Sequence, residues 1–201
     1  MPRTKEKCAE MKEASKEKIT SAALKLFADK GLAATSTQDI AKAADVSMGL
    51  MYSHYKSKEE LFTSLIEQAA AGLHRMTDSM DAAENPAEMM EGIAAETVAD
   101  LESGEDFLNM MMLITQGLMA GSGAVCEKIN EADMKAIAAA ERLIKHGQDI
   151  GVFGAGNPRE MAVFFFANIQ GLAMLKCALG EHFRTPSAEI LTAFLYRGLP
   201  K

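Results

Sequence analysis

The sequence contains little cysteine, proline or aromatic residue, and each shortage narrows the possible fold classes. Cys8, Cys126 and Cys177 lie far apart and form no C-x-x-C pair, so we interpret them as reduced thiols, not as a disulfide framework or a zinc site. Only five prolines and 6% aromatic residues occur among 201, and Ala, Met, Leu, Glu and Lys are abundant. This composition favours an all-α chain.

No apolar run approaches the length of a membrane span, and the charged N-terminus does not resemble a signal peptide. We therefore expect a soluble, cytoplasmic protein that has no membrane partner and needs no cofactor. Cys126, Glu141 and His146 could be imagined as a nucleophile cluster, but one predicted helix carries all three, so they cannot converge. The histidines also lack the HExxH-type spacing of a metal site. Both observations argue against an enzyme.

The net charge of −7 would argue against a nucleic-acid partner, but the charge is unevenly distributed. Residues 1–62 hold 11 Lys and Arg against 9 Asp and Glu, which gives +2, whereas residues 63–201 hold 10 against 19, which gives −9. This asymmetry fits a DNA-binding part attached to an acidic body. Because +2 is a small excess, the placement of single cations matters more than the total charge.

Apolar residues recur at helical spacing along most of the chain. Residues 8–30 form the first predicted helix, and Gly31 ends it. Two Asn-Pro pairs start later helices, since Asn is a good N-cap and Pro suits the first helical position. About nine helices are expected, and those after the first three cover approximately residues 57–80, 86–103, 105–119, 124–149, 158–179 and 185–198.

Residues 36–62 organise the rest of the chain, because they combine two short helices with the start of a third. Thr37 is expected to cap the first helix, and Asp45 to end it in a left-handed conformation. Ser47 caps a second helix that reaches about residue 55, and Ser57 caps the third with Glu60 at the capping-box spacing. Two short helices joined by such a turn are a helix-turn-helix, whose second helix enters the DNA major groove.

The segments ITSAALKLFADKG, TQDIAKAADVS and MYSHYKSKEELF, in this order and spacing, resemble the N-terminal domain of the TetR family of bacterial transcriptional regulators. The most specific part is the Tyr-x-x-Tyr/Phe-Lys-x-Lys-Glu-x-Leu extension. The resemblance implies a helix-turn-helix DNA-binding domain, expected at residues 1–56, and a helical ligand-binding and dimerisation domain at residues 57–201.

By their position in the family motif, Thr37, Tyr52, His54 and Lys58 resemble the residues that contact DNA phosphates. A hydroxyl at a helix start, a phenol, an imidazole and an ammonium can each donate a hydrogen bond to phosphate. Alternatively, Tyr52 packs in the core and Lys58 is only a solvated charge. The polar residues 1–12 are either a disordered terminus or an arm that reaches phosphates or the minor groove.

Contacts to DNA bases are expected from the first helix and from the start of the second, at Gln38, Ser47, Met48, Gly49 and Leu50. Gln38 suits the N6 and N7 atoms of adenine, whereas Met48 and Leu50 can contact only thymine methyl groups. Family members often carry polar residues at these two positions, so this surface is unusually apolar. Leu50 could instead pack inside, but Met51 already occupies the core position of the motif.

The TetR resemblance also implies a small effector ligand bound among the middle helices. The 15 methionines are consistent with an adaptable apolar pocket, because methionine is flexible and polarizable, although each by itself could simply fill the core. No buried charge stands out from which to infer the charge of the ligand. The candidate ligand-binding residues are Met76, Met80, Thr97, Leu101, Met110, Met111, Ile114, Met134 and Ile137.

The last two predicted helices have apolar faces with small residues, which are expected to form a homodimer as a four-helix bundle about a two-fold axis. The alternative is that these faces belong to the core of the monomer. One recognition helix reads few bases, so the DNA side also favours a dimer on a palindromic site. The candidate interface residues are Phe164, Asn168, Gly171, Leu172, Leu175, Leu191, Phe194 and Leu195.

These features together predict a homodimeric repressor that binds a double-stranded DNA operator and is released by a small apolar or aromatic ligand. Ligand binding would move the helix at residues 57–80 and so change the separation of the recognition helices, provided that the ligand prefers the form that does not bind DNA. Two alternatives remain: a constitutive DNA-binding regulator without ligand response, and a transcriptional activator.

Overall fold

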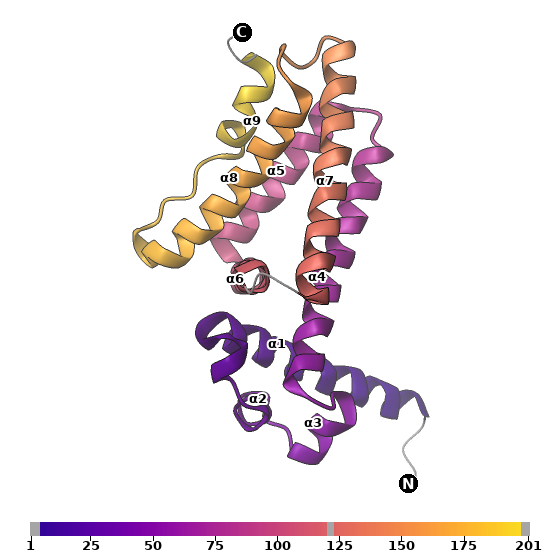
Figure 1. Cartoon of the computed structure of the whole chain (residues 1–201), viewed down its shortest axis with the longest axis vertical. Helices are drawn as coiled ribbons and strands as arrows, with labels where there is room; N and C mark the ends of the chain where they lie inside the picture. The colour runs from indigo at the N-terminus through magenta and orange to yellow at the C-terminus, as the bar shows by residue number, and fades with distance from the viewer. Residues whose placement is uncertain (1–4, 120–122, 198–201) are drawn as a thin grey trace.

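The computed structural model describes residues 5–119 and 123–197, and within these residues the expected all-α fold class is confirmed (Figure 1). The described part has no strand and consists of nine α-helices and one 3₁₀ helix. Of the expected features, residues 1–4 of the arm, the turn at residues 121 and 122 and a helix end at residue 198 lie outside it. The helices are α1 (Lys5–Ala34), α2 (Thr37–Ala43), α3 (Met48–His54), α4 (Lys58–Asp81), α5 (Pro86–Ser103), α6 (Glu105–Met119), α7 (Ala124–Asp149), α8 (Pro158–Leu179), the 3₁₀ helix Gly180–His182 and α9 (Ala188–Arg197).

Helices α1 to α3 form a head at one end of the molecule, and α4 links it to a body that contains α5, α7, α8 and α9 (Figure 1). α4 and α7 run parallel, because Glu67 pairs with Lys128 and Asp81 pairs with Arg142 at the same sequence offset. α4 is therefore attached to the body along its upper half, while its first turns remain in the head.

Two caps differ from expectation. The N-cap of α2 is Ser36, not Thr37: its hydroxyl accepts a hydrogen bond from the N–H of Asp39 at 3.1 Å, and the Asp39 carboxylate accepts one from the N–H of Ser36 at 3.2 Å. Since a serine precedes the threonine at the right spacing from an acidic residue, the reciprocal bonds favour the earlier cap. The Ser36 hydroxyl also lies 2.7 Å from the Asp39 carboxylate, and its hydrogen bond, followed by that of the Ser36 N–H, lowers the pKa of Asp39. Thr37 is consequently the first helical residue.

Helix α4 begins as expected at Ser57, whose hydroxyl accepts from the N–H of Glu60 at 3.1 Å. However, the Glu60 carboxylate accepts from the N–H of Lys56 instead of that of Ser57, so the capping box is incomplete. Asp45 has the expected left-handed conformation (φ 53°), and Gly31 (φ 79°) interrupts α1 before a last turn at residues 32–34.

The core consists of two separate clusters of buried side chains. The head cluster contains α1 to α3 and the first half of α4, but also Leu113 of α6 and Ile129 of α7. The body cluster joins the end of α4 to α5, α7, α8 and α9. Four further buried apolar residues of α5, α7 and α8 belong to neither cluster, and we call them the middle layer: Leu101, Ala132, Ala136 and Ala173. The buried Phe183, after the 3₁₀ helix, also belongs to neither cluster.

Helix α6 lies at the junction of head and body, where Figure 1 shows it almost end-on. Its sequence is apolar nearly all round, which is typical of a buried helix. However, only Leu113 and Gly117 are buried, and most of its other apolar side chains are partly exposed. The physical reason is that one side of α6 packs on the head cluster, through Leu113, Met110, Ile114 and Leu118, while its other side chains are only partly covered.

Candidate nucleic-acid interface

The exposed face of α3 lies at the far end of the head. Ile40 and Ala41 of α2 and Met51 of α3 are buried in the head cluster, which fixes the two helices against α1. Leu50 consequently points outward and is 39% exposed, as expected from the core position of Met51. Gln38 is exposed on the neighbouring α2, so an amide and an apolar side chain share this surface.

The start of α3 is less available for base contacts than the sequence suggested. Ser47 is its N-cap and accepts a hydrogen bond from the N–H of Leu50 at 3.2 Å. Met48 is only half-exposed, because its side chain packs against the head cluster. Met48 therefore has a structural role that the sequence did not indicate, while Gly49 and Leu50 remain on the open face.

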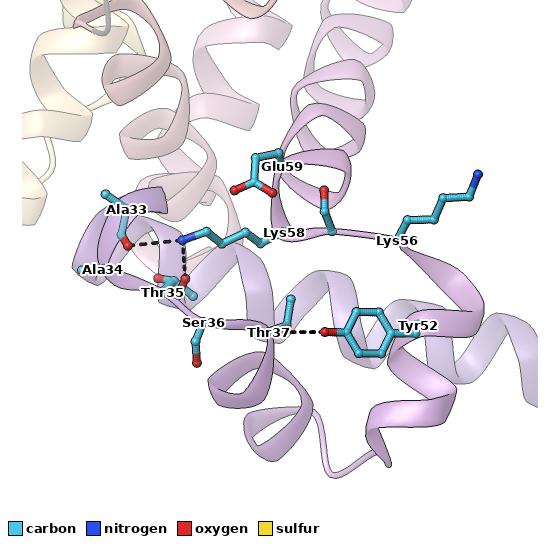
Figure 2. Close-up of a pocket in the computed structure, with 10 residues that line it drawn as sticks. Ala33, Ala34, Thr35, Ser36, Thr37, Tyr52, Lys56, Lys58 and Glu59 are labelled. Atoms are coloured by element: carbon cyan, nitrogen blue, oxygen red, sulfur yellow. Dashed lines mark hydrogen bonds between the residues drawn. The ribbon is translucent and has the colours of Figure 1, made fainter.

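Thr37 and Tyr52 come together from α2 and α3, with their hydroxyl oxygens 3.4 Å apart (Figure 2). Tyr52 is 51% exposed, so the alternative that it packs in the core is wrong. Both side chains line a surface hollow of about 400 Å³, to which Ser36, Lys56, Ser57, Lys58 and the acidic Glu59 also contribute. The hollow lies beside the first turns of α2 and α4, where backbone dipoles favour an anion such as phosphate.

Lys58 does not present a free ammonium group to this hollow. Its Nζ donates to the backbone carbonyls of Leu32, Ala33 and Thr35 at 2.8, 3.2 and 2.8 Å, and Figure 2 shows it turned toward the end of α1. An ammonium group has three donors, and all three are used here. The sequence-based expectation that Lys58 is a phosphate contact is therefore revised: in this structure Lys58 joins α4 to the α1–α2 corner.

Lys56 is the cation that the sequence reasoning missed. Its side chain is exposed, it lines the hollow and it forms no ion pair within the described part of the chain. The Lys-x-Lys of the motif contained both residues, but the pattern alone did not reveal which ammonium group was engaged by backbone carbonyls.

His54, the last residue of α3, is half-buried, and its Nε2 lies 2.8 Å from the Ser15 hydroxyl of α1. Because that hydroxyl already donates to the carbonyl of Lys12, the geometry fits an imidazole Nε2–H that donates to Ser15. Burial, and then the charges of Lys12 and Lys16, lower the pKa of His54 below its usual value of 6.5. The imidazole is therefore neutral at pH 7 and ties the recognition helix to α1.

The structure does not bring the nine candidate ligand residues into one site. Met110 and Ile114 pack on the head cluster, Met76 and Ile137 pack on the body cluster, and Met80 is inside it. Leu101 belongs to the middle layer and Met111 is half-buried on α6.

Two of these expectations need correction. Met134 is 55% exposed, since it lies on the side of α7 away from the middle layer. The buried Thr97 donates its hydroxyl to the carbonyl of Ile93 at 2.8 Å, within its own helix, so its proton is not available to a ligand.

Polar side chains of α6 connect this helix to α8 and to α1. Gln170 of α8 donates to the hydroxyl of Thr115 of α6 at 2.7 Å, and Thr115 donates to the carbonyl of Met111. Gln116 of α6 donates to the carbonyl of Ala28 in α1 at 3.1 Å, which connects the body to the head. Over residues 5–119 and 123–197, no group of three or more His, Cys, Asp or Glu side chains is arranged to hold a metal ion.

The candidate dimer residues separate into two groups. Phe164 and Leu175 are 53% and 50% exposed on α8, with the half-exposed Asn168 and Gly171 between them. In contrast, Leu191 and Leu195 are buried in the body cluster, on which Leu172 and Phe194 also pack. For Leu191 and Leu195 the expectation of a dimer contact is therefore wrong, because these side chains attach α9 to its own protomer.

The exposed apolar side chains of α8 continue beyond the expected set. Met174 and Leu179 are exposed on α8, and Ile190 is exposed on α9. Sequence periodicity could not separate them from the buried residues, since α8 is apolar on most of its circumference. We call the surface formed by Phe164, Gly171, Met174, Leu175 and Leu179 the α8 stripe.

Comparisons with known proteins agree with this arrangement. Residues 19–65 match the family model for bacterial regulatory proteins of the tetR family. The HTH-type transcriptional repressor KstR2 of Mycobacterium tuberculosis is 38% identical over 69 residues, which cover 34% of each chain. The chain spans only about a third of the length of the curated relatives that it matches, 36% and 34% of two of them.

Solved structures extend the similarity to nearly the whole chain. The MbdR regulator of Azoarcus sp. CIB superposes with a TM-score of 0.77 at 20% identity and covers 93% of this chain and 100% of that chain. A SmeT–triclosan complex superposes with a TM-score of 0.69 at 19% identity, over 94% and 100% of the two chains. At this level of identity the likeness shows the fold alone.

Proposed function

The N-terminal domain of this chain belongs to the TetR family of bacterial regulatory proteins, and from this premise we propose that the protein is a homodimeric, ligand-responsive transcriptional repressor. The observation that carries the proposal is the outward face of α3, which lies beside a hydroxyl-lined hollow and an exposed lysine. The KstR2 relative is named a repressor, which favours repression over activation for this chain.

In the proposed complex, α3 enters the major groove and the hollow receives a backbone phosphate. Thr37 and Tyr52 donate hydroxyl protons to that phosphate, and Lys56 supplies the positive charge. Gln38 reads adenine and Leu50 contacts thymine methyl groups. His54 and Lys58 act indirectly, because one holds α3 against α1 and the other holds the start of α4 against the α1–α2 corner.

The proposed dimer forms through the α8 stripe. Contrary to the expectation that no apolar run approaches the length of a membrane span, the segment Pro158–His182 is long and apolar enough by composition, with a mean hydropathy of 1.6. Only 17% of its apolar window is buried in the single chain. A second copy of the same surface would cover it around a two-fold axis, which is the usual arrangement of such homodimers. Burial of this surface accounts for the apolar character of α8 without a membrane.

The proposed effector site is the middle layer together with the half-buried side chains of α6. SmeT, a protein of the same fold, forms a complex with triclosan, which supports an apolar or aromatic ligand here. A ligand in this layer would contact α6, which carries Leu113 into the head cluster and holds α1 through Gln116. The signal would therefore pass through α6 as well as α4, which extends the helix 57–80 mechanism expected from the sequence.

The experiment that tests the DNA-binding part is selection of sequences from a random duplex library by the purified protein, followed by affinity measurements on the enriched site. We expect a palindromic site whose half-sites lie about one helical turn apart or a multiple of it. Absence of any enriched sequence would refute specific DNA binding.

The same site, placed before a reporter gene, distinguishes the remaining alternatives. Repression predicts lower expression with the protein present and recovery when a ligand lowers operator affinity. Higher expression would indicate an activator, and operator affinity unaffected by every ligand that binds would indicate a constitutive regulator.

A further inference from the structure

Asp133 differs from the other charged residues of α7 because it is half-buried and has no ion pair among the described residues. Most charges of this helix are joined in ion pairs within α7 or with a neighbouring helix, and Glu127 in its first turn is exposed to solvent. The paired residues are Lys128, Glu131, Lys135, Glu141, Arg142, Lys145 and Asp149. Asp133 forms no ion pair, and no side-chain hydrogen bond is recorded for it in the described part of the chain.

Asp133 lies on the inward side of α7. Residues three and four positions apart share a helix face, and three of these positions are the buried Ile129 and Ala136 and the half-buried Ile137. The fourth, Asn130, is exposed, so Asp133 lies at the edge of the buried face. Its neighbour Ala132 and the residue Ala136 are two of the four members of the middle layer. The carboxylate therefore leaves the helix next to the region that we propose as the effector site.

Apolar side chains, several of them short, lie near this carboxylate on α7. Ala132 and Ala136 of α7, and Ala173 of α8 in the same layer, have short apolar side chains and are buried. Burial raises the pKa of Asp133, and no charged side chain acts on it in the opposite direction. A half-buried carboxylate without a partner is costly unless a cation approaches it.

From this geometry we infer that Asp133 is the polar anchor of the effector site and that the effector is an apolar molecule with a cationic amine or ammonium group. This inference rests on the proposed ligand response and adds the charge of the ligand, which the sequence alone did not indicate. The apolar part would lie against the half-buried methionines of α6, while the cation pairs with the carboxylate. An anion of the same length would be repelled by Asp133.

A matched set of three ligands tests the inference: decyltrimethylammonium, decanoate and 1-decanol, each below its micelle concentration, with affinity measured by calorimetry on the full-length protein. We expect the cation to bind at least about tenfold more tightly than the other two, which corresponds to one well-placed charge interaction. Asp133→Asn should weaken binding of the cation by about tenfold or more and change binding of 1-decanol little. Glu131→Gln, on the exposed side of the same helix, is the control and should bind all three ligands like the wild type.

A purely structural role is excluded by measuring thermal unfolding and molecular mass of the ligand-free variant. Removing an unpaired, half-buried charge should leave the unfolding midpoint of Asp133→Asn equal to or above that of the wild type, and the oligomeric state unchanged. If Asp133→Asn dissociates the oligomer, the carboxylate belongs to the subunit interface and the inference is overturned.

The remaining outcomes separate this inference from the proposed function. Equal binding of the three ligands with no effect of Asp133→Asn, or binding of none of them, overturns the role of Asp133. The ligand-responsive repressor would survive equal binding if any of the compounds lowered operator affinity. The proposed ligand response would fail only if ligands of every charge bound the protein without changing its affinity for the operator.

Discussion

Lys56 and Lys58 are two residues apart and identical in type, yet the structure gives them different tasks. Lys58 donates to three carbonyls at the α1–α2 corner, whereas Lys56 is exposed beside the hollow. We predict that Lys56→Ala weakens binding to all DNA sequences. It should also reduce, by about one unit, the slope of the logarithm of DNA affinity against the logarithm of salt concentration. The measurement is operator affinity at several salt concentrations.

Lys58→Ala should act differently, since it leaves three carbonyls without their donor. We expect a loss of about 2 kcal/mol in the free energy of unfolding, measured by urea denaturation, and a salt slope close to that of the wild type. Lys145→Ala, in the body, is the control for both measurements. A reduced salt slope with unchanged stability would instead indicate that Lys58 contacts a DNA phosphate directly.

The lowered pKa of His54 makes the stability of the folded protein depend on pH. Its pKa is lowered in the folded protein, so the unfolded chain binds the proton more tightly, and stability falls as the pH drops through about 6.5. In His54→Gln the amide can still donate to Ser15 but does not titrate. We expect the variant to lose less stability than the wild type between pH 7.5 and 5.5, measured by urea denaturation.

The exposed His182 provides the control variant, since it lies outside the head. His182→Gln should follow the wild-type pH profile. If His54→Gln has the same profile as well, the imidazole does not favour its neutral form in the folded head.

At the scale of elements, α6 is the helix whose environment differs most from its sequence. It is apolar enough for a core helix, but it borders the middle layer and attaches to α1 through Gln116. We predict that Gln116→Ala changes ligand-free operator affinity by less than about threefold but reduces the ligand-induced loss of affinity by about 0.5–2 kcal/mol. Operator titrations with and without a saturating ligand measure both quantities.

The ion pair between Lys25 and Glu105 is a second contact between α1 and α6, and it provides a control for Gln116→Ala. Both partners are exposed, and such pairs contribute little. Lys25→Ala should therefore preserve the ligand effect on DNA binding. If Gln116→Ala preserves it equally, the coupling does not pass through the α1–α6 contact.

The whole molecule has a head with a single recognition helix and a body with an uncovered apolar stripe. We predict that Phe164→Asp converts the dimer into a folded monomer and weakens operator binding by at least about a hundredfold, because one head then reads half of the site. Light scattering gives the oligomeric state, circular dichroism the fold, and titration the affinity.

Ile150→Asp is the matched control for this experiment. Ile150 is also exposed and apolar, but it lies at the end of α7 and outside the α8 stripe. This variant should remain dimeric. A Phe164→Asp protein that is still dimeric and binds DNA normally would place the interface on another surface.

Local sequence patterns determined the helices and the helix-turn-helix, because caps, glycines and apolar periodicity act within a few residues. The left-handed Asp45, the Ser47 and Ser57 caps and the Asn-Pro helix starts could all be predicted. The outward direction of Leu50 also followed, since Met51 had to be inside. The cap of α2 was misplaced by one residue, and the capping box expected at Ser57 is incomplete.

The tertiary structure alone decided which chemically equivalent side chains are free. Lys58 is engaged and Lys56 is not, Leu195 is buried and Leu175 is not, and Asp133 is half-buried without a partner in the described part of the chain while Arg142 of the same helix is paired. Each of these distinctions depends on a neighbour that is distant in sequence, such as the α1 carbonyls near Lys58. Helical periodicity gives the direction of a side chain around its own axis, but not which other helix lies there or whether that place is already filled.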